Sequence, residues 1–287
     1  MVIGKHQIDF EGAKIAYSDS GSGEAVVLLH CTASSSRQWR GFTETYGQDF
    51  RVIAIDLFGH GDSDTWPGHR PLTLADEAKA VSLVLDRIGE PVHLIGHSYG
   101  GAVALQVALK EARRIRSLTV IEPVAFYLLR GGHASEMRYF LEINAVASNI
   151  STAAMSGNFA SGMERFVDYW GGRGAWKALP EEKRRDLVRA IGTVALNFWS
   201  TTTESTRRDA FRSLDLPTLV MEGSGSGPVT RRICELLRAE LPNCRGAVIE
   251  AAGHMSPLTD PAAVNALIVQ HISEGNRLAR PRCCSAA

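Results

Sequence analysis

The segment VHLIGHSYGG, residues 92–101, decides the fold of this chain. It opens with an apolar run from Val92 to Ile95 and continues into a serine that is flanked by Gly96 and Gly100. A segment rich in Ala, Val and Leu follows at 102–108. This order predicts a buried strand, a tight turn and a helix, with Ser98 at the tip of the turn.

The glycines beside Ser98 have a physical reason. A residue at the tip of so sharp a turn adopts strained backbone angles, and side chains at positions 96 and 100 would clash with neighbouring groups. The helix that starts after Ser98 directs amide N–H groups and a positive dipole end toward any oxyanion formed at the serine. Ser98 is therefore the candidate nucleophile.

A second motif, DLFGHGDS at 56–63, follows an apolar strand pattern at 51–55. It is similar to the D-x-x-G-x-G-x-S loop of the α/β-hydrolase family, and with the Ser98 turn it makes roughly the first 125 and last 70 residues resemble that family. The resemblance implies one fold shared by esterases, lipases, lactonases, C–C hydrolases, epoxide hydrolases and dehalogenases. We expect Asp56 and Ser63 to tie their loop through side-chain hydrogen bonds, without a catalytic role.

Composition excludes several classes of function. The 287 residues carry 31 basic and 31 acidic side chains, so nothing in the charge favours nucleic acid as a partner. No apolar run approaches the ~18 residues of a membrane helix, and the N-terminus lacks the apolar core of a signal peptide, so we expect a cytoplasmic protein without stable membrane insertion. The five cysteines lack metal-ligand spacing and are expected to be reduced thiols. The sequence gives no indication of the oligomeric state.

The alternation of strand and helix patterns predicts an α/β fold, a doubly wound and mostly parallel sheet of eight strands. An antiparallel hairpin is expected to open it. We expect residues 1–123 and 215–274 to form this core and residues 275–287 to form a disordered tail. The expected strands are 6–10, 13–19, 25–29, 51–55, 92–95, 117–121, 216–221 and 247–250.

Between the two parts of the core, residues 124–214 lack strand patterns and are expected to form a helical lid. Helical spacing is present at 137–146, 163–170, 181–196 and 204–211. Aromatic side chains concentrate in this segment; most of them must form its own packing, and a minority would wall an apolar pocket over the sheet.

A serine nucleophile needs a base. Among the nine histidines, only His254 lies in a loop of small residues after the last expected strand, where the resemblance places the family's base. The family usually carries its acid shortly after the strand that is 216–221 here, but Ser226 occupies that position. A serine cannot stabilise an imidazolium as a buried carboxylate does.

Two carboxylates compete for the role of the acid. Glu122 ends the strand expected to lie next to the nucleophile strand, and some haloalkane dehalogenases and a lactonase of the family resemble this arrangement. Glu222 still belongs to the end of strand 216–221, and its direction is open. We expect Glu122 to be the acid, with Glu222 and a degraded or dyad site as alternatives. A purely structural role for Glu122, at the entrance to the lid, also remains open.

The resemblance further implies an oxyanion hole formed by the backbone N–H groups of Thr32 and Tyr99. The family's loop usually begins His-Gly, and here Cys31 stands in place of that glycine after His30. Cys31 offers a rival nucleophile, but no basic partner lies at a fixed spacing from it. A small buried thiol is the simpler interpretation.

These residues predict a serine hydrolase that cleaves a small apolar carboxylic ester, or a lactone, without a metal or organic cofactor. Ser98 disfavours dehalogenase and epoxide hydrolase chemistry, because those relatives need a carboxylate at its position. Two alternatives remain. One is a C–C bond hydrolase of a dienoic keto-acid, which an arginine or polar patch in the lid pocket would favour. The other is a ligand receptor that retains the triad.

Overall fold

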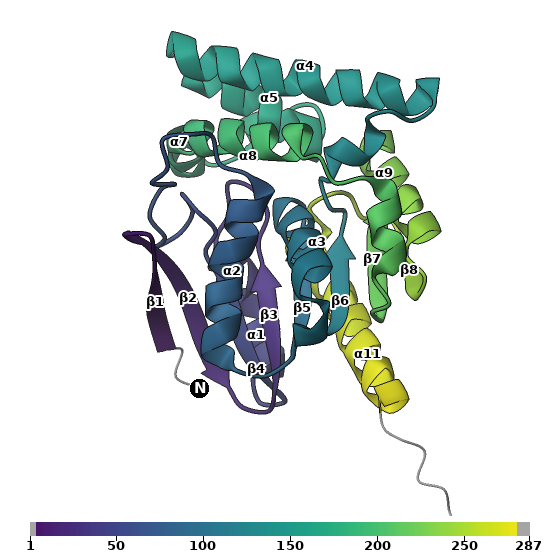
Figure 1. Cartoon of the computed structure of the whole chain (residues 1–287). Coiled ribbons are helices and arrows are strands. Elements are labelled where there is room, and N and C mark those ends of the chain that lie inside the picture. The colour runs from purple at the N-terminus through teal and green to yellow at the C-terminus, as the bar shows by residue number, and fades with distance from the viewer. Residues whose placement is uncertain (1–3, 280–287) are drawn as a thin grey trace, which may run out of the picture.

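The computed structural model describes residues 4–279 of the chain. Its centre is an eight-stranded sheet in the order β1-β2-β4-β3-β5-β6-β7-β8 (Figure 1). β2 runs antiparallel to its neighbours β1 and β4, and the other neighbouring strands pair in parallel. The sheet confirms the expected fold class. Its strands are β1 Gly4–Phe10, β2 Ala13–Gly21, β3 Glu24–Leu29, β4 Phe50–Ile55, β5 Val92–His97, β6 Ile115–Ile121, β7 Thr218–Gly223 and β8 Cys244–Ile249.

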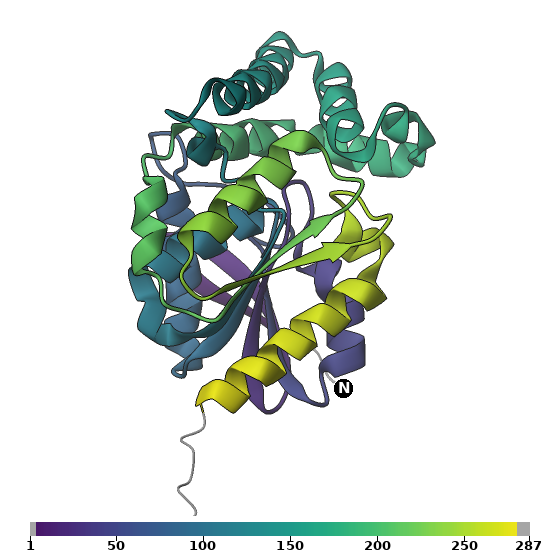
Figure 2. The ribbon, with the colours of Figure 1, turned by 90° about the vertical axis from the view of Figure 1, so that its right-hand side faces the viewer.

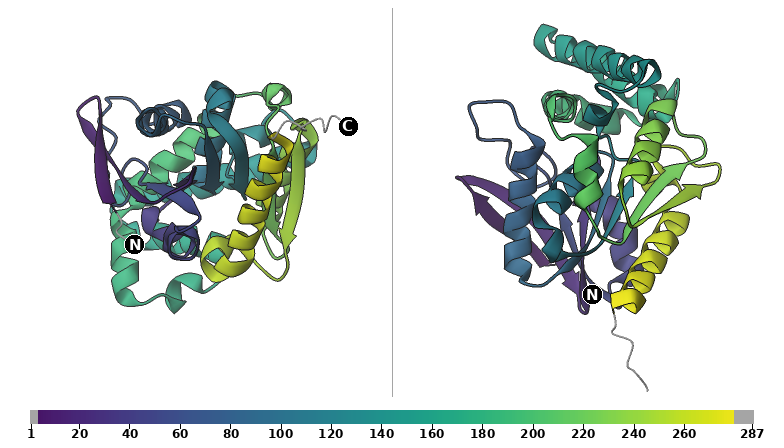
Figure 3. Two further views of the ribbon diagram at one scale, coloured as in Figure 1. Left: turned by 90° about the horizontal axis from the view of Figure 1, so that it is seen from below. Right: turned by 45° about the vertical axis from the view of Figure 1, so that its right-hand side comes forward.

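Helices cover both faces of the sheet, as its continuous apolar strands require. Side chains of α2 (Leu74–Ile88), α3 (Tyr99–Glu111) and α9 (Pro228–Glu240) belong to one buried cluster, and those of α1 (Arg40–Tyr46) and α11 (Pro261–Ala279) belong to a second. The view from below in Figure 3 separates these two helical layers.

The residues at the two ends of α2 explain where it begins and ends. Thr73 and Asp76 form a reciprocal capping box, and Gly89 ends the helix in the left-handed conformation. The end of the chain differs from the prediction. The tail was expected to start at Gly275, but α11 continues to Ala279. That expectation is wrong for 275–279, and residues 280–287 lie outside the described residues.

Residues 124–214 are helical and form a layer above the carboxyl ends of the parallel strands (Figures 1 and 2). Two of the expected helices differ from the structure. The segment 181–196 breaks at Ala190 into two helices, and the segment 204–211 becomes a 3₁₀ helix only from Arg208. The elements of this layer are η3 Phe126–Leu129, α4 Ala134–Ser156, α5 Phe159–Gly171, α6 Ala175–Ala178, α7 Glu181–Arg189, α8 Ile191–Thr203 and η4 Arg208–Ser213.

Candidate active site

Ser98 lies at the tip of the turn between β5 and α3, with φ 55° and ψ −114°. A side chain at Gly96 would collide with the carbonyl of Gly100, and a side chain at Gly100 would collide with the carbonyls of Leu29 and His30. The strained turn therefore depends on both glycines, as the sequence predicts. The Ser98 hydroxyl lies at the N-terminus of α3 and at the edge of a pocket.

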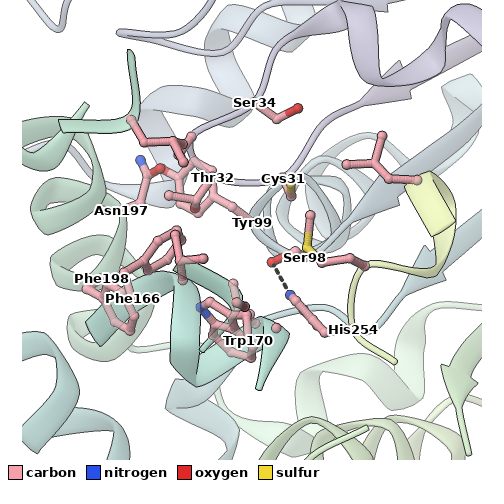
Figure 4. Close-up of a pocket in the computed structure, with 18 of the residues that line it drawn as sticks. Cys31, Thr32, Ser34, Ser98, Tyr99, Phe166, Trp170, Asn197, Phe198 and His254 are labelled. Carbon is pink, nitrogen blue, oxygen red and sulfur yellow. Dashed lines mark hydrogen bonds between the residues drawn. The ribbon is translucent and has the colours of Figure 1, made fainter. Parts of the chain in front are cut away.

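His254 approaches Ser98 from the loop after β8. Its Nε2 lies 3.0 Å from the Ser98 Oγ, and its Nδ1 lies 2.8 Å from Oε2 of Glu122 (Figure 4 draws the first of these bonds). The structure therefore brings Ser98, His254 and Glu122 into one hydrogen-bonded chain. All three side chains are buried.

Glu122 follows β6 directly and has a positive φ of 42°. Its Oε1 accepts hydrogen bonds from the Gly223 amide at 2.8 Å and from the Ser226 hydroxyl. Burial alone would raise the pKa of Glu122, but the hydrogen bonds from His254, Ser226 and Gly223 more than offset this and lower it to about 2. Glu122 is therefore a carboxylate at neutral pH.

Glu222 takes a different partner. Its carboxylate forms an ion pair with Arg238 of α9 at 2.9 Å. Within the described part of the chain it makes no hydrogen bond to His254. The geometry favours Glu122 over Glu222 as the partner of the histidine.

The loop that carries Thr32 lies across the pocket from His254 (Figure 4). Between residues 4 and 279, neither the Thr32 amide nor the Tyr99 amide donates to another protein group, so both remain available for an oxyanion. His30 holds the loop, because its Nδ1 lies 2.7 Å from the Cys31 carbonyl oxygen and its Nε2 accepts from the Leu57 amide at 3.1 Å. The role of the two amides stays a prediction.

Sequence reasoning missed a side-chain bridge behind the site. Gln38 accepts a hydrogen bond from the Cys31 amide at 3.1 Å, and its Nε2 donates to Nδ1 of His97 at 3.1 Å. His97 Nε2 in turn donates to the His254 carbonyl at 2.8 Å. The bridge joins the loop of Cys31 and Thr32, the serine turn and the histidine loop, and no motif marks Gln38 in the sequence.

Cys31 is buried beside the pocket, and burial raises the pKa of its thiol to about 12. A thiol needs its anionic form to act as a nucleophile, so this environment disfavours the Cys31 alternative.

The loop of Asp56 and Ser63 is tied as predicted. Asp56 accepts from the Ser36 and Asp62 amides, and the Ser63 hydroxyl donates to the Asp56 carbonyl.

A cavity of about 300 Å³ lies between Ser98 and the helical layer. Four of the aromatic side chains expected in the helical segment line it: Phe126, Phe166, Trp170 and Phe198. Others, such as Phe159 and Trp199, are exposed. The expectation that a minority of these aromatics walls an apolar pocket is confirmed.

Two general features concern the described residues as a whole. Over residues 4–279, no cluster of three or more His, Cys, Asp or Glu side chains is arranged to hold a metal ion. Within the same range, no helix combines the length and apolar character needed to cross a membrane.

Comparison with known proteins agrees with this architecture. The family model described as "Alpha/beta hydrolase family" matches residues 26–267. The chain belongs to this family. Both the serine turn and the histidine loop of this alpha/beta hydrolase lie within the matched range.

Two relatives match this alpha/beta hydrolase over most of their length. The pimeloyl-[acyl-carrier protein] methyl ester esterase of Aeromonas hydrophila subsp. hydrophila is 27% identical over 255 residues, 84% of this chain and 92% of the esterase. The soluble epoxide hydrolase of Corynebacterium sp. (strain C12) is 25% identical over 276 residues, 91% of this chain and 94% of that protein. Both are hydrolases, but they act on different bonds.

A third match is partial. The dihydrolipoyllysine-residue acetyltransferase component of the acetoin cleaving system of Cupriavidus necator is 34% identical over 120 residues, which span 41% of this chain and 32% of that protein. Among solved structures, an esterase from Thermogutta terrifontis superposes with a TM-score of 0.75 at 22% identity and covers 95% of this chain and 99% of its own. This last likeness concerns the fold.

Proposed function

We propose that this alpha/beta hydrolase cleaves a carboxylic ester, or its cyclic form, a lactone, through an acyl-serine intermediate. The observation that carries the proposal is the chain of contacts from Ser98 through His254 to Glu122, at 3.0 and 2.8 Å. These are the contacts that a serine nucleophile, a base and an orienting acid need.

In the first step, the Ser98 oxygen attacks the ester carbonyl carbon while Nε2 of His254 takes the hydroxyl proton. The carbonyl oxygen becomes an oxyanion, which the Thr32 and Tyr99 amides would receive. His254 then returns the proton to the leaving alcohol, and the acyl group stays on Ser98. A water molecule, deprotonated by the same nitrogen, attacks the acyl-serine. The bond between the acyl carbon and the Ser98 oxygen then breaks, His254 returns the proton to that oxygen, and the acid is released.

Glu122 fixes the ring so that Nε2 faces Ser98, and its negative charge stabilises the imidazolium that forms when the proton arrives. Its low pKa supports this role, because the carboxylate keeps its charge at neutral pH. We propose that residues 124–214 act as the lid, and that the acyl group of a small apolar substrate occupies the cavity beneath them.

Two observations favour an ester over the bonds that other members of the family cleave. Epoxide hydrolase and dehalogenase chemistry needs a carboxylate nucleophile, and position 98 is a serine. C–C bond hydrolysis would be favoured by an arginine or polar patch, but the described residues that line the cavity are mostly apolar and include no arginine.

The test combines labelling with turnover. A fluorophosphonate probe should label the wild-type protein and Cys31→Ala but leave Ser98→Ala unlabelled. Turnover of a p-nitrophenyl ester faster than about one per minute would favour an enzyme over a receptor, since enzymes typically turn over 1–10³ times per second. Labelling that survives in Ser98→Ala and disappears in Cys31→Ala would end the proposal.

A further inference from the structure

The indole of Trp170 is stacked on the imidazole of His254. The ring centroids lie 4.2 Å apart and the planes meet at 26°, and Figure 4 shows the two rings side by side among the residues that line the cavity. Trp170 belongs to α5 of the helical segment, whereas His254, Ser98 and Glu122 all belong to the sheet core. A side chain of the proposed lid therefore contacts the proposed base directly.

Both nitrogen atoms of the imidazole already have hydrogen-bond partners. Nε2 faces Ser98 and Nδ1 faces Glu122, and the His97 ring lies farther away, with its centroid 5.2 Å from that of His254 and its plane tilted by 43°. Burial, followed by the proximity of His254, lowers the pKa of His97 to about 3, so His97 remains neutral. Among the described residues, Trp170 thus presents the closest aromatic face to the ring of His254.

The indole is itself held in place by the helical layer. The Tyr169 ring packs edge-on against it with the centroids 4.9 Å apart, and Phe126 stacks at 6.4 Å. The Tyr169 hydroxyl donates to Glu142 of α4 at 2.8 Å. The orientation of Trp170 therefore depends on the packing of α5 against α4.

The face of an indole attracts a cation, and the imidazole becomes a cation when it accepts the Ser98 proton. A flat apolar cover also keeps water away from the hydrogen bond between His254 and Glu122. We propose that Trp170 is a positioning residue that holds the His254 ring and stabilises its charged form, so that the base is complete only when α5 is docked on the core. This inference rests on the proposed function.

A simpler role has a different signature. Trp170 also lines the cavity, so as a mere wall it would affect long acyl chains more than acetate, and KM more than kcat. If Trp170 acts through His254, its loss lowers kcat equally for acetate and hexanoate.

The variants are Trp170→Leu, which keeps an apolar cover without a π face, and Trp170→Phe, which keeps a smaller π face. Trp199→Leu is the matched control, because this indole lies on α8, is half exposed and does not line the cavity.

We expect Trp170→Leu to lower kcat on both p-nitrophenyl acetate and hexanoate by the same factor, about 3- to 30-fold, and Trp170→Phe to recover most of the loss. The rate of labelling by a fluorophosphonate should fall by the same factor, and Trp199→Leu should remain close to the wild type. If Trp170→Leu does not fold, Trp170→Met repeats the comparison.

A loss confined to hexanoate, or to KM, would overturn this inference and leave the hydrolase proposal intact. A wild-type protein that hydrolyses no ester and leaves Ser98 unlabelled would overturn both.

Discussion

The hydroxyl of Ser226 donates a hydrogen bond to Oε1 of Glu122. Ser226 stands where the resemblance to the family places an acid, and here it supports a carboxylate that comes from another strand. The Gly223 amide donates to the same oxygen, which leaves Oε2 of Glu122 for His254. The loop after β7 therefore contributes to the candidate site by supporting Glu122.

Strand pairing explains why either position can supply the acid. β6 and β7 are parallel neighbours with Ile121 opposite Met221, and the Glu122 amide donates to the Met221 carbonyl at 2.9 Å. The carboxyl ends of the two strands consequently meet at one point beneath the histidine loop. We therefore expect that a carboxylate on the loop after either strand can reach the same ring nitrogen.

We predict that Glu122→Gln lowers kcat by roughly 10³–10⁴-fold with little change in KM, by analogy with the loss of the acid in a protease triad. The amide keeps the size of the side chain but cannot stabilise the imidazolium. Steady-state kinetics on a p-nitrophenyl ester measure the effect. Glu222→Gln is the matched control and should cost less than about tenfold, because Glu222 pairs with Arg238. Near-native kcat in Glu122→Gln, together with a large loss in Glu222→Gln, would reverse the assignment.

The double variant Glu122→Gln with Ser226→Asp should recover part of the lost kcat. Ser226 now contacts the carboxylate of Glu122, which is the partner of His254 Nδ1. An aspartate at position 226 would therefore place a carboxylate close to the same nitrogen. The same kinetic assay compares the double variant with Glu122→Gln alone. No recovery would mean that the loop after β7 cannot bring a carboxylate to the ring.

The sequence predicted the parts of the fold that local rules determine. The apolar strand before Ser98 and the two glycines that flank the serine each have a short-range physical cause, and the predicted strand and turn are present. The choice of His254 as the base rested on its loop of small residues after the last strand and on the resemblance to the family, which places the base there. The choice of Glu122 depended on the resemblance and on the order of the strands.

Other features depend on long-range contacts that no spacing reveals. Gln38 joins three loops, but in the sequence it is one polar residue in a helical pattern. The stacking of Trp170 on His254 unites residues from two parts of the chain, and an aromatic-rich segment could not identify which ring would make this contact. The break at Ala190 was missed because apolar spacing continues on both sides of it.

The start of the helical layer is anchored by Glu136, a buried carboxylate that pairs with Arg232 at 2.5 Å and Arg208 at 3.0 Å. Burial would raise the pKa of Glu136, but the two arginines and the His133 amide lower it to about 2. A lowered pKa stabilises the folded state above the carboxyl's ordinary value of 4.5, and this stabilisation disappears as the pH falls toward 2. Glu136→Gln should therefore cost about 1–3 kcal/mol at pH 7, since both arginines are partly exposed, and progressively less below pH 4.5. Urea unfolding at several pH values measures this, and a constant difference between pH 7 and pH 3 would contradict it.

Glu77 should show the opposite dependence. It is fully buried beneath Tyr99, whose hydroxyl lies 3.3 Å from its carboxyl, and burial raises the pKa of Glu77 to about 8. A raised pKa stabilises the folded state below 4.5, and the stabilisation is lost as the pH rises to 8. Glu77→Gln mimics the protonated side chain, so relative to the wild type it should gain stability between pH 5 and pH 9, on the order of a few kcal/mol. The exposed Glu181→Gln is the control. A Glu77→Gln difference that does not change with pH would mean that this carboxyl is charged in the folded protein.

The last prediction concerns the acyl group. The cavity of about 300 Å³ is lined mainly by apolar side chains, so each methylene that enters it should improve kcat/KM by up to ~0.8 kcal/mol, about fourfold. p-Nitrophenyl esters from acetate to octanoate should therefore rise in kcat/KM until the cavity is full and then level or fall. The p-nitrophenyl half-ester of adipic acid should react more slowly than the hexanoate, because its free carboxylate would have to leave water.

The wall of the cavity offers a direct control for this profile. Phe198→Ala removes an aromatic side chain that lines it and should flatten the rise with chain length, whereas Trp199→Ala, at the next position and half exposed, should leave the profile unchanged. Acetate should respond least to either change, because it is too short to use the wall. A wild-type profile that is flat from acetate to octanoate would show that the acyl group lies elsewhere, and that the helices over the sheet do not define its site.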